Sequence, residues 1–433
     1  MNNISLILDN PVRDLSYVSL IAMDLAEKGF EVNIIPSNMR HYELIFSEPE
    51  YVLYPHQREG SSAQEISFLS DKGIEVGVLE TEQHVKENYF INYQIPKNLN
   101  LLKKPKHIFS WGFYFSSILK KNKLYSDKQI KIVGNPRYDE YIFNTEIIDK
   151  TIKLLIATSF ELANPNFLNK RESMKAFQND NMSKDDYLRF HNIHKESLEK
   201  LTMLIQENFF NIENGLKLRP HPYENDKLYI KKLSKSLVLD NRVPIINHLK
   251  SAESFLHYHS VSSVDSAVLQ IPSINMSWFP MDSKVHDSTR FMKKTSYQPN
   301  TEDEMIELVE LINNRQLTPK LDSNNNIFEE FLYKLDGISY KRITDHIARD
   351  FISNSNKNFT FDGPFNDLNK TEHYLKFIIN KKKWTKSKKY FSANDIKEYI
   401  NTQKAILNKN VNFEIVNNEF KNLKLTSVKV VLN

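Results

Sequence analysis

The sequence contains no cysteine among its 433 residues. Disulfide bonds and thiolate metal sites are therefore excluded, and the composition is typical of a protein from a reducing compartment. Apolar runs are short, and none approaches the roughly 18 residues that a membrane-spanning helix needs. The first ten residues have no basic segment before their apolar run, which indicates a first strand rather than a signal peptide. We therefore expect a cytoplasmic protein.

Glycine is also scarce, with 9 residues in the chain. Neither GxGxxG nor GxxxxGK[ST] occurs, which argues against a dinucleotide dehydrogenase and a P-loop ATPase. The net charge of +4 is too small to indicate a nucleic-acid partner, and we expect none.

Up to about residue 330, short apolar runs alternate with amphipathic segments. This alternation is typical of α/β proteins, in which helices cover both faces of a parallel sheet. The expected strands are Ile4–Leu8, Val32–Ile35, Tyr51–Tyr54, Ile74–Leu79, His107–Trp111, Ile130–Val133, Lys153–Thr158, Leu216–Leu218, Ser254–Tyr258 and Ser273–Met276. We predict two Rossmann-like domains, at residues 1–145 and 146–330. A mainly helical, basic extension at 331–433 would end in a strand at 423–432.

An Arg219-Pro220-His221-Pro222 turn follows one of the strands expected in the second domain. The two prolines fix φ and exclude a helix, so His221 is expected on a rigid extended turn. With Arg219 beside it, the turn is a candidate site for a nucleotide phosphate.

A second candidate phosphate segment contains Ser260, Ser262 and Ser263. It lies between an apolar strand and a helix expected at Val264–Gln270. Serine hydroxyls and the first N–H groups of a helix can bind a phosphate together. The alternative is a buried turn whose serines only cap the helix. The nearby Arg-Pro-His-Pro turn favours the phosphate site.

A strand expected at Ile74–Leu79 is followed by Glu80, Glu82 and His84. Open α/β sheets bind their ligands at the carboxyl ends of the strands. Two close carboxylates repel, which raises the pKa of at least one and favours a general base. A solvated loop explains the spacing equally well.

Further polar residues follow the first two expected strands. We predict that they lie on the same rim, where they would contact an acceptor or an acidic sugar, although each alone is also typical of a capping or surface residue. The set is Asp9, Arg13, Asp14, Asn38, Arg40 and His41. The segment Gly134–Asp139 (GNPRYD) predicts a sharp turn at a hinge, where Arg137 pairs with Asp139 or with an anion.

Two features have competing interpretations. His257 and His259 share a strand face, but no third ligand is evident, so we predict no metal site. The basic stretch from Lys381 to Phe391 interleaves lysines with aromatic residues. It is either a solvated surface or a contact with an anionic membrane or glycan, which would place the protein at the inner face of the cytoplasmic membrane.

Several of these segments together resemble a known family. They are Arg13-Asp14, Glu80–Gln83, Phe109–Gly112, Gly134–Asp139, Arg219–Glu224 and Ser260–Pro272. The chain resembles bacterial surface carbohydrate biosynthesis proteins of GT-B type, which are related to polysialyltransferase-type and Kdo transferases that use CMP-activated sugars. The resemblance covers most of the first 300 residues and implies two Rossmann-like domains facing a cleft.

The resemblance also implies roles for individual residues. Glu82 becomes the candidate base, with Glu80 as the alternative, because Gln83 replaces the family's motif glycine and Thr81 separates the glutamates. The implied nucleotide-binding residues are Arg219, His221, Pro222, Glu224, Ser260, Ser262, Ser263 and Asp265, of which Asp265 would hold the ribose. The candidates for the donor carboxylate or acceptor are Arg13, Asp14, Arg40 and Arg137.

The function expected from the resemblance is metal-independent and cofactor-independent glycosyl transfer. A nonulosonic or Kdo-like acid would move from a CMP donor to an oligosaccharide or glycolipid, with inversion. Similar GNPR-like and HP elements occur in teichoic acid polymerases, so a CDP-polyol phosphotransferase is one alternative. A non-catalytic or epimerase-like GT-B protein is the other.

Overall fold

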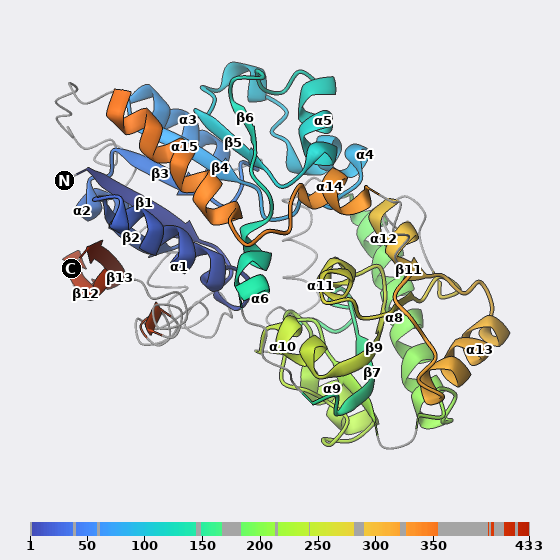
Figure 1. The fold of residues 1–433 in the computed structure, drawn as a ribbon. Coiled ribbons are helices and arrows are strands. Elements are labelled where there is room, and N and C mark those ends of the chain that lie inside the picture. Colours follow the sequence, from blue (N-terminus) through green and yellow to red (C-terminus); the bar gives the residue numbers. More distant parts are fainter. Residues whose placement is uncertain are drawn as a thin grey trace. The chain divides into compact units, whose positions relative to one another are not determined.

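The computed structural model describes residues 2–37, 40–58, 61–143, 149–166, 183–212, 215–241, 243–280, 290–320, 326–353, 397, 400–401, 411–420 and 423–432. The chain divides into two compact units. Unit 1 comprises Met1–Thr145 and Phe328–Asn433, and unit 2 comprises Glu146–Ile327 (Figure 1). Among the described residues, no helix combines the length and apolar character needed to cross a bilayer.

Unit 1 is built on one sheet with the strand order β12-β13-β2-β1-β3-β4-β5-β6. Six of the described strands are parallel: β1 (Asn3–Leu8), β2 (Glu31–Pro36), β3 (Tyr51–Tyr54), β4 (Glu75–Leu79), β5 (His107–Ser110) and β6 (Ile130–Ile132). Each lies within one or two residues of a predicted strand. These short apolar runs were recognisable because parallel strands are buried on both faces.

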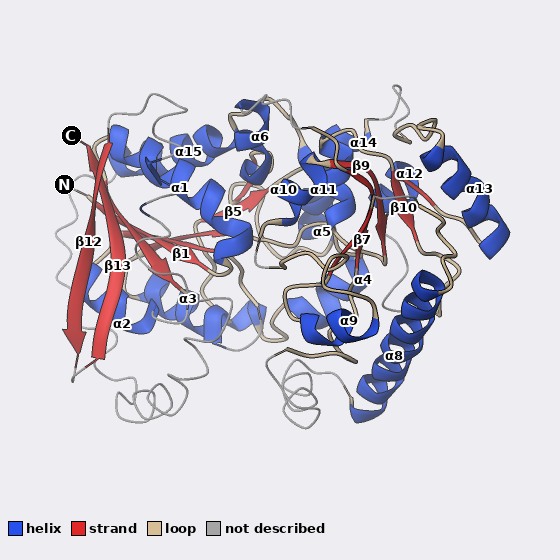
Figure 2. Ribbon diagram, turned by 90° about the horizontal axis from the view of Figure 1, so that it is seen from below, coloured by secondary structure: helices blue, strands red, loops and turns tan. Residues whose placement is uncertain are grey.

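Helices cover both faces of this sheet. Figure 2 shows α1 and α15 on one face and α2 and α3 on the other. Helix α1 begins where Asn10 accepts a hydrogen bond from the N–H of Val12 (3.2 Å), and it is followed by Gly29 at φ +88°. The helices of unit 1 are α1 (Pro11–Glu27), α2 (Arg40–Ser47), α3 (Ser61–Asp71), α4 (Glu87–Tyr89), α5 (Phe113–Lys121), α6 (Asp139–Phe143), α14 (Ile327–Leu332, at the unit boundary) and α15 (Ser339–Ser353).

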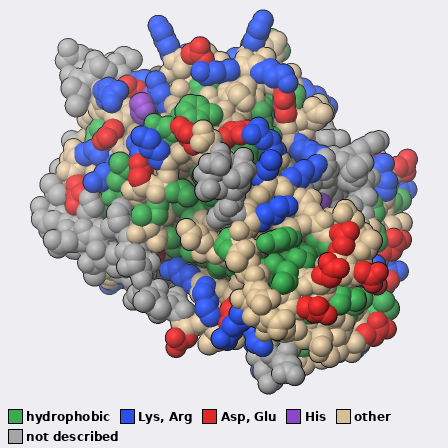
Figure 3. Space-filling view, turned by 45° about the vertical axis from the view of Figure 1, so that its right-hand side comes forward, with side chains coloured by type: hydrophobic (Ala, Val, Ile, Leu, Met, Phe, Trp, Pro, Cys, Tyr) green, Lys and Arg blue, Asp and Glu red, His purple; other side chains and the backbone are tan. Residues whose placement is uncertain are grey.

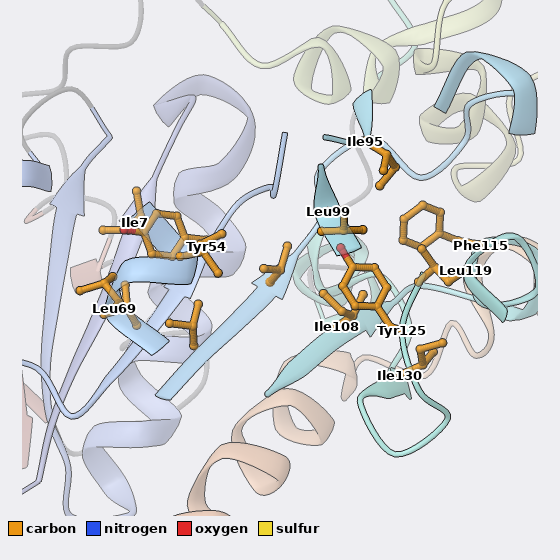
Figure 4. Packing of buried hydrophobic residues seen from close by; sticks show 14 of the residues in the cluster. Ile7, Tyr54, Leu69, Ile95, Leu99, Ile108, Phe115, Leu119, Tyr125 and Ile130 are labelled. Atoms are coloured by element: carbon orange, nitrogen blue, oxygen red, sulfur yellow. The ribbon is translucent and has the colours of Figure 1, made fainter. Parts of the chain in front are cut away.

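A hydrophobic core lies between the sheet of unit 1 and the helices and turns that cover it. It also includes the short 3-10 helix η2 (Leu99–Leu101). Figure 4 shows that the side chains come from strands, helices and connecting turns alike. Its labelled members are Ile7, Tyr54, Leu69, Ile95, Leu99, Ile108, Phe115, Leu119, Tyr125 and Ile130.

The described part of the last hundred residues belongs to unit 1 and contains helix α15 and two strands. Helix α15 packs on α1, where Lys28 donates to the Thr344 hydroxyl (2.8 Å). The strand β13 (Leu423–Leu432), predicted at those residues, pairs antiparallel with β2 and with the unpredicted β12 (Val411–Phe420). This hairpin covers a sheet edge that would otherwise expose unpaired backbone groups. The basic stretch at 381–391 and most of the helix expected at 396–407 lie outside the described residues.

Unit 2 contains a parallel sheet with the order β11-β10-β9-β7-β8. Its strands are β7 (Ile152–Ala157), β8 (Leu216–Arg219), β9 (Ala252–His257), β10 (Ser273–Asn275) and β11 (Ser296–Tyr297). Its helices are α8 (Lys184–Gln206), α9 (Asp226–Lys232), α10 (Ile245–Lys250), α11 (Ser262–Val268), α12 (Arg290–Thr295) and α13 (Glu302–Asn313). In both sheets the strand order reverses beside the first strand, as in doubly wound folds. The α/β class with two Rossmann-like sheets is confirmed.

The GNPRYD segment (Gly134–Asp139) lies in the N-terminal part of unit 1 and is hydrogen-bonded to the first turn of α15. Gly134 has φ +90°, and Asn135 caps the short 3-10 helix η3 (Pro136–Tyr138). The buried Asp139 carboxylate accepts from the N–H of Tyr340 (2.7 Å), and burial raises the pKa of Asp139 to about 7. Asp139 therefore caps α15, which is a different role from the ion pair with Arg137 that we considered.

We expect Gly134→Ala to lower the free energy of unfolding by about 2 kcal/mol, because a side chain is strained at positive φ. Its Cβ would also lie 2.4 Å from the Ser339 Oγ. Gly29→Ala is a matched control, since Gly29 has a similar φ and nothing lies within 4 Å of its added Cβ. Urea unfolding of both variants separates strain from the contact with Ser339. Equal losses would show that this contact contributes nothing.

Candidate functional site

The carboxyl ends of the strands in unit 1 carry most of the polar residues selected from the sequence. They surround a small pocket. The lining residues come from α1, from the end of β4 and from the turns after β4, β5 and β6: Arg13, Asp14, Tyr17, Leu79, Glu80, Thr81, Trp111, Asn135, Pro136 and Arg137. Four segments that carry the family resemblance therefore meet at one pocket.

Two carboxylates follow β4 and differ in exposure. Glu80 is 4% exposed and lines the pocket, whereas the side chain of Glu82 is 38% exposed and lies outside the lining set. Arg58 bridges them, with its Nη2 atom 2.9 Å from Glu80 Oε1 and 3.1 Å from Glu82 Oε2. Sequence reasoning missed Arg58, because the turn after β3 contains no motif.

The environments of the two carboxylates shift their pKa values in opposite directions. Burial raises the pKa of Glu80, and Arg58 offsets only part of that effect. Burial also raises the pKa of Glu82, but Arg58 and Arg13 together outweigh it and lower the pKa. The predicted rise therefore occurs at Glu80, and its main cause is burial rather than repulsion. Glu82 is ionised at neutral pH.

Arg13 is engaged by carboxylates on several sides. Its guanidinium donates to Asp14 at 2.6 and 2.9 Å, and it lies 3.6 Å from both Asp9 and Glu82. Burial lowers the pKa of Arg13, but Asp14 and Glu82 raise it overall. Arg13 is thus paired with carboxylates of unit 1, most closely with Asp14. Its binding of a donor carboxylate stays a prediction.

Arg40 also has a protein partner. It donates to Glu65 (2.7 Å) and to the carbonyl of Ser37 (2.7 Å), and it does not line the pocket. Its described contacts therefore stabilise the start of α2, which differs from the predicted contact with a ligand. Arg137, which was predicted at a hinge, lines the pocket.

Gln83 occupies the position at which the family's acidic motif has glycine. Its amide donates to the carbonyls of Glu80 (3.0 Å) and Phe109 (2.9 Å) and accepts from the N–H of Trp111 (2.7 Å). The side chain thus ties the turn after β4 to β5 and fixes the backbone that carries both glutamates. His84 packs between Trp111 and Phe331, and burial lowers its pKa to about 3, so it is neutral.

In unit 2, the turn after β8 is organised by Glu224. Its buried Oε1 accepts from the Thr158 hydroxyl (2.7 Å), the N–H of Phe160 (3.0 Å) and the N–H of His221 (3.2 Å). The Tyr229 hydroxyl donates to Oε2. Burial raises the pKa of Glu224. Because Glu224 is 0% exposed, its role is to shape the turn. This differs from the contact with a nucleotide that the resemblance implies.

His221 is half-buried at this turn. Its Nδ1 accepts from the N–H of Tyr223 (3.3 Å), so the neutral ring carries its proton on Nε2. Arg219 is buried and donates to the carbonyls of Asn241 (3.2 Å) and Val243 (3.0 Å). These contacts hold the turn together, whereas we had expected Arg219 to touch a phosphate or to orient Glu224.

The serine cluster starts a helix two residues earlier than predicted. Helix α11 begins at Ser262, and the Ser260 hydroxyl accepts from the N–H of Ser262 (3.2 Å). Ser263 and Asp265 are both fully buried in the first turn. The N-cap of α11 is Val261, without a side-chain cap hydrogen bond, so the bond to Ser260 closes a local turn just before the helix. Phosphate binding by the serines stays a prediction.

The first histidine of the doublet His257/His259 is held by packing and hydrogen-bonding contacts inside unit 2. His257 is fully buried, stacks on Phe255 and contacts the Ser296 hydroxyl (3.2 Å). Burial lowers the pKa of His257 to about 3. Within the described parts of the chain, no group of three or more histidine, aspartate or glutamate side chains is arranged to hold a metal ion.

Glu161 is a candidate ligand-binding residue of unit 2 that was not predicted from the sequence. It follows β7, beside the point at which the strand order of unit 2 reverses and at which doubly wound sheets bind ligands. Its Oε2 is buried and has no hydrogen-bond partner among the described residues. Burial raises the pKa of Glu161 to about 8, so the carboxyl is protonated at neutral pH. No motif surrounds it in the sequence.

Comparisons with solved structures give clear matches. The UDP-GlcNAc 2-epimerase of Methanocaldococcus jannaschii, in complex with UDP-GlcNAc and UDP, matches with TM-score 0.50 and 14% identity, over 80% of this chain and 99% of that chain. The S. aureus MnaA–UDP structure matches with TM-score 0.52 and 13% identity, over 83% and 100%. The wall teichoic acid polymerase TagF, soaked with CDPG, matches with TM-score 0.51 and 11% identity, over 82% and 90%.

The fold is of the GT-B type. At identities of 11–14%, the likeness concerns the fold, and the ligands named above are those of the matched proteins. No model of a protein family matches the chain, and no curated protein matches it. The GT-B fold places the candidate base in one Rossmann-like unit and the candidate nucleotide-binding residues in the other.

Proposed function

We propose that this GT-B protein is a glycosyltransferase of bacterial surface glycan synthesis that uses a nucleotide-activated sugar. The observation that carries the proposal is Glu82, a partly exposed carboxylate kept ionised by Arg13 and Arg58 at the ligand-binding edge of a Rossmann-like sheet. Glu82 is therefore deprotonated at neutral pH, which is the form that a general base requires. The GT-B neighbours that bind UDP-GlcNAc, UDP or CDPG support a sugar-nucleotide ligand.

The reaction we propose is inverting transfer from a CMP-linked nonulosonic or Kdo-like acid. An acceptor hydroxyl attacks the anomeric carbon while Glu82 takes its proton. The bond between that carbon and the phosphate oxygen breaks, and CMP leaves as an anion. His221 Nε2–H and the Ser262 hydroxyl stabilise the leaving phosphate. We assign the donor carboxylate to Arg137, which lines the pocket together with Glu80.

The test is a titration of the full chain with CMP, CDP, UDP and GDP, measured by calorimetry. We expect CMP to bind most tightly and His221→Ala to weaken CMP binding about tenfold, because one hydrogen bond to a charged phosphate is lost. His191→Ala is the control, since His191 lies elsewhere in unit 2, on α8. Unchanged CMP affinity in His221→Ala would remove this residue from the phosphate site.

A CDP-polyol phosphotransferase is the second candidate, and the match to TagF favours it. In that reaction the same phosphate site would serve a diphosphate. Preference for CDP over CMP in the titration would support this candidate. Preference for UDP, together with conversion of UDP-GlcNAc without an acceptor, would instead support a 2-epimerase like the matched enzymes.

A further inference from the structure

One segment of unit 1 carries a concentrated positive charge. Residues 97–131 contain nine lysines, no arginine and a single acidic residue, Asp127. The segment therefore has a net charge of +8, whereas the whole chain has +4, so all other residues together carry −4. The stretch includes β5, α5 and β6, and the site described above uses none of its lysines.

The two halves of this segment lie side by side. Lys104 Nζ donates to the carbonyl of Leu124 (2.6 Å) and lies 5.6 Å from the ring centre of Tyr125. The Gln129 amide donates to the carbonyl of Pro105 (2.7 Å). These contacts bring the turn that contains η2 against the α5–β6 connection. We call the resulting surface the basic face, defined by Lys97, Leu101, Lys103, Lys120, Lys121, Lys123 and Lys128.

The lysines of the basic face are accessible. The side chains of Lys103, Lys120 and Lys121 are 54%, 50% and 72% exposed. Each contacts one carboxylate, namely Asp71, Asp127 and Glu87, at about 3 Å, and such exposed ion pairs contribute little. Figure 3 shows lysine and arginine side chains gathered along the upper rim, where α5 and β6 lie in Figure 1.

An apolar side chain projects from the same face. Leu101, in η2, is 80% exposed, the highest value among the large hydrophobic residues that the structure describes. Its neighbour Leu99 is buried in the core beside Phe115 and Leu119 (Figure 4). The backbone that presents Leu101 is therefore anchored. A fixed apolar side chain amid lysines suits an anionic bilayer, in which lysines meet lipid headgroups and a leucine enters the acyl boundary.

We propose that the basic face of unit 1 docks this protein onto an anionic lipid bilayer. The contact is peripheral and reversible, because one leucine and a group of lysines provide far less anchoring than a spanning helix. Each lysine near an anionic surface strengthens binding about fivefold. Salt weakens the contact by screening. The inference does not depend on the reaction proposed above.

The test is co-sedimentation of the full chain with vesicles of phosphatidylcholine, with and without phosphatidylglycerol. We expect binding only with phosphatidylglycerol, and a decrease with rising salt. Replacing Lys103, Lys120, Lys121 and Lys128 with glutamine should lower the partition coefficient at least about tenfold. The matched control replaces the exposed Lys184, Lys195, Lys231 and Lys235 of unit 2, which gives the same net charge. An equal loss in the control would overturn the proposal.

Two further variants test the apolar and alternative contacts. Leu101→Ser should lower binding about fivefold, whereas Ile306→Ser, at a 42% exposed position of α13, should not. A variant with glutamine in place of Lys381, Lys382 and Lys383 tests the other basic stretch. Binding lost in that variant but kept in the basic-face variant would overturn the assignment. If the protein bound heparin but not vesicles, the ligand of the basic face would be a soluble polyanion rather than a bilayer.

Discussion

Replacing Glu82 with glutamine is expected to lower kcat for sugar transfer by roughly 10²- to 10⁴-fold, the usual contribution of a general base. Glutamine keeps the size and the hydrogen bond from the Gln94 amide (3.3 Å to Glu82 Oε2) but cannot take a proton. Nucleotide affinity should stay within about threefold of the wild type, because the nucleotide-binding candidates lie in unit 2. Steady-state kinetics and a parallel CMP titration measure both quantities.

The pH profile gives a second readout of the same residue. Arg58 and Arg13 lower the pKa of Glu82 below its ordinary value of 4.5, despite burial. The base is therefore ionised across the neutral range, and kcat should fall on the acid side only below about pH 4.5. Arg58→Ala removes one of the two cations, so its acid limb should move to higher pH.

Glu80→Gln is the matched comparison for Glu82→Gln. Glu80 is buried, and its Oε1 accepts from Arg58 and from the N–H of Glu82. We expect a smaller loss of kcat, caused by the altered position of Glu82. If Glu80→Gln abolished transfer while Glu82→Gln kept it, the base would be Glu80. Loss of transfer and CMP binding together in Glu82→Gln would contradict a role limited to proton transfer.

Replacing Glu224 with alanine is expected to lower the free energy of unfolding of unit 2 by about 3–5 kcal/mol. Alanine leaves four donors without their acceptor: the hydroxyls of Thr158 and Tyr229 and the N–H groups of Phe160 and His221. It also creates a cavity at a fully buried position. Urea unfolding monitored by circular dichroism measures the loss.

Glutamine at position 224 should be tolerated far better. Three of the four donors meet the single oxygen Oε1, which a glutamine carbonyl can replace, and the Tyr229 hydroxyl can rotate to accept from the new amide. We expect a loss of about 1 kcal/mol or less. Glu207→Ala, at an exposed position after α8, is the control and should be neutral. Equal losses in the alanine and glutamine variants would refute this account.

The predictable part of the fold consists of its buried parallel strands. Runs such as Tyr51–Tyr54 are apolar throughout, because helices cover both faces of the sheet, and this pattern is visible without coordinates. The same reasoning placed Arg13 and Glu80 at one rim, since parallel strands end at the same edge. Position along a strand, rather than residue identity, made these predictions possible.

Residues whose roles depend on three-dimensional partners could not be assigned from the sequence. Arg219 and Glu224 belong to a motif that suggests ligand contacts, but their side chains are used to fold the turn. Arg58 and Glu161 belong to no motif, and only the packed structure shows their surroundings. Strand β12 was missed because polar residues such as Asn417 and Asn418 interrupt its apolar pattern.

Strand β13 makes the completion of unit 1 depend on residues that are synthesised after unit 2. The ribosome makes β1 to β6 first and then all of unit 2, and only later makes the residues that pair with β2. Unit 2 is continuous in the sequence, so it can fold while unit 1 still lacks its partner strand. During this interval the growing chain presents an uncovered sheet edge, to which a chaperone or a second nascent chain can bind.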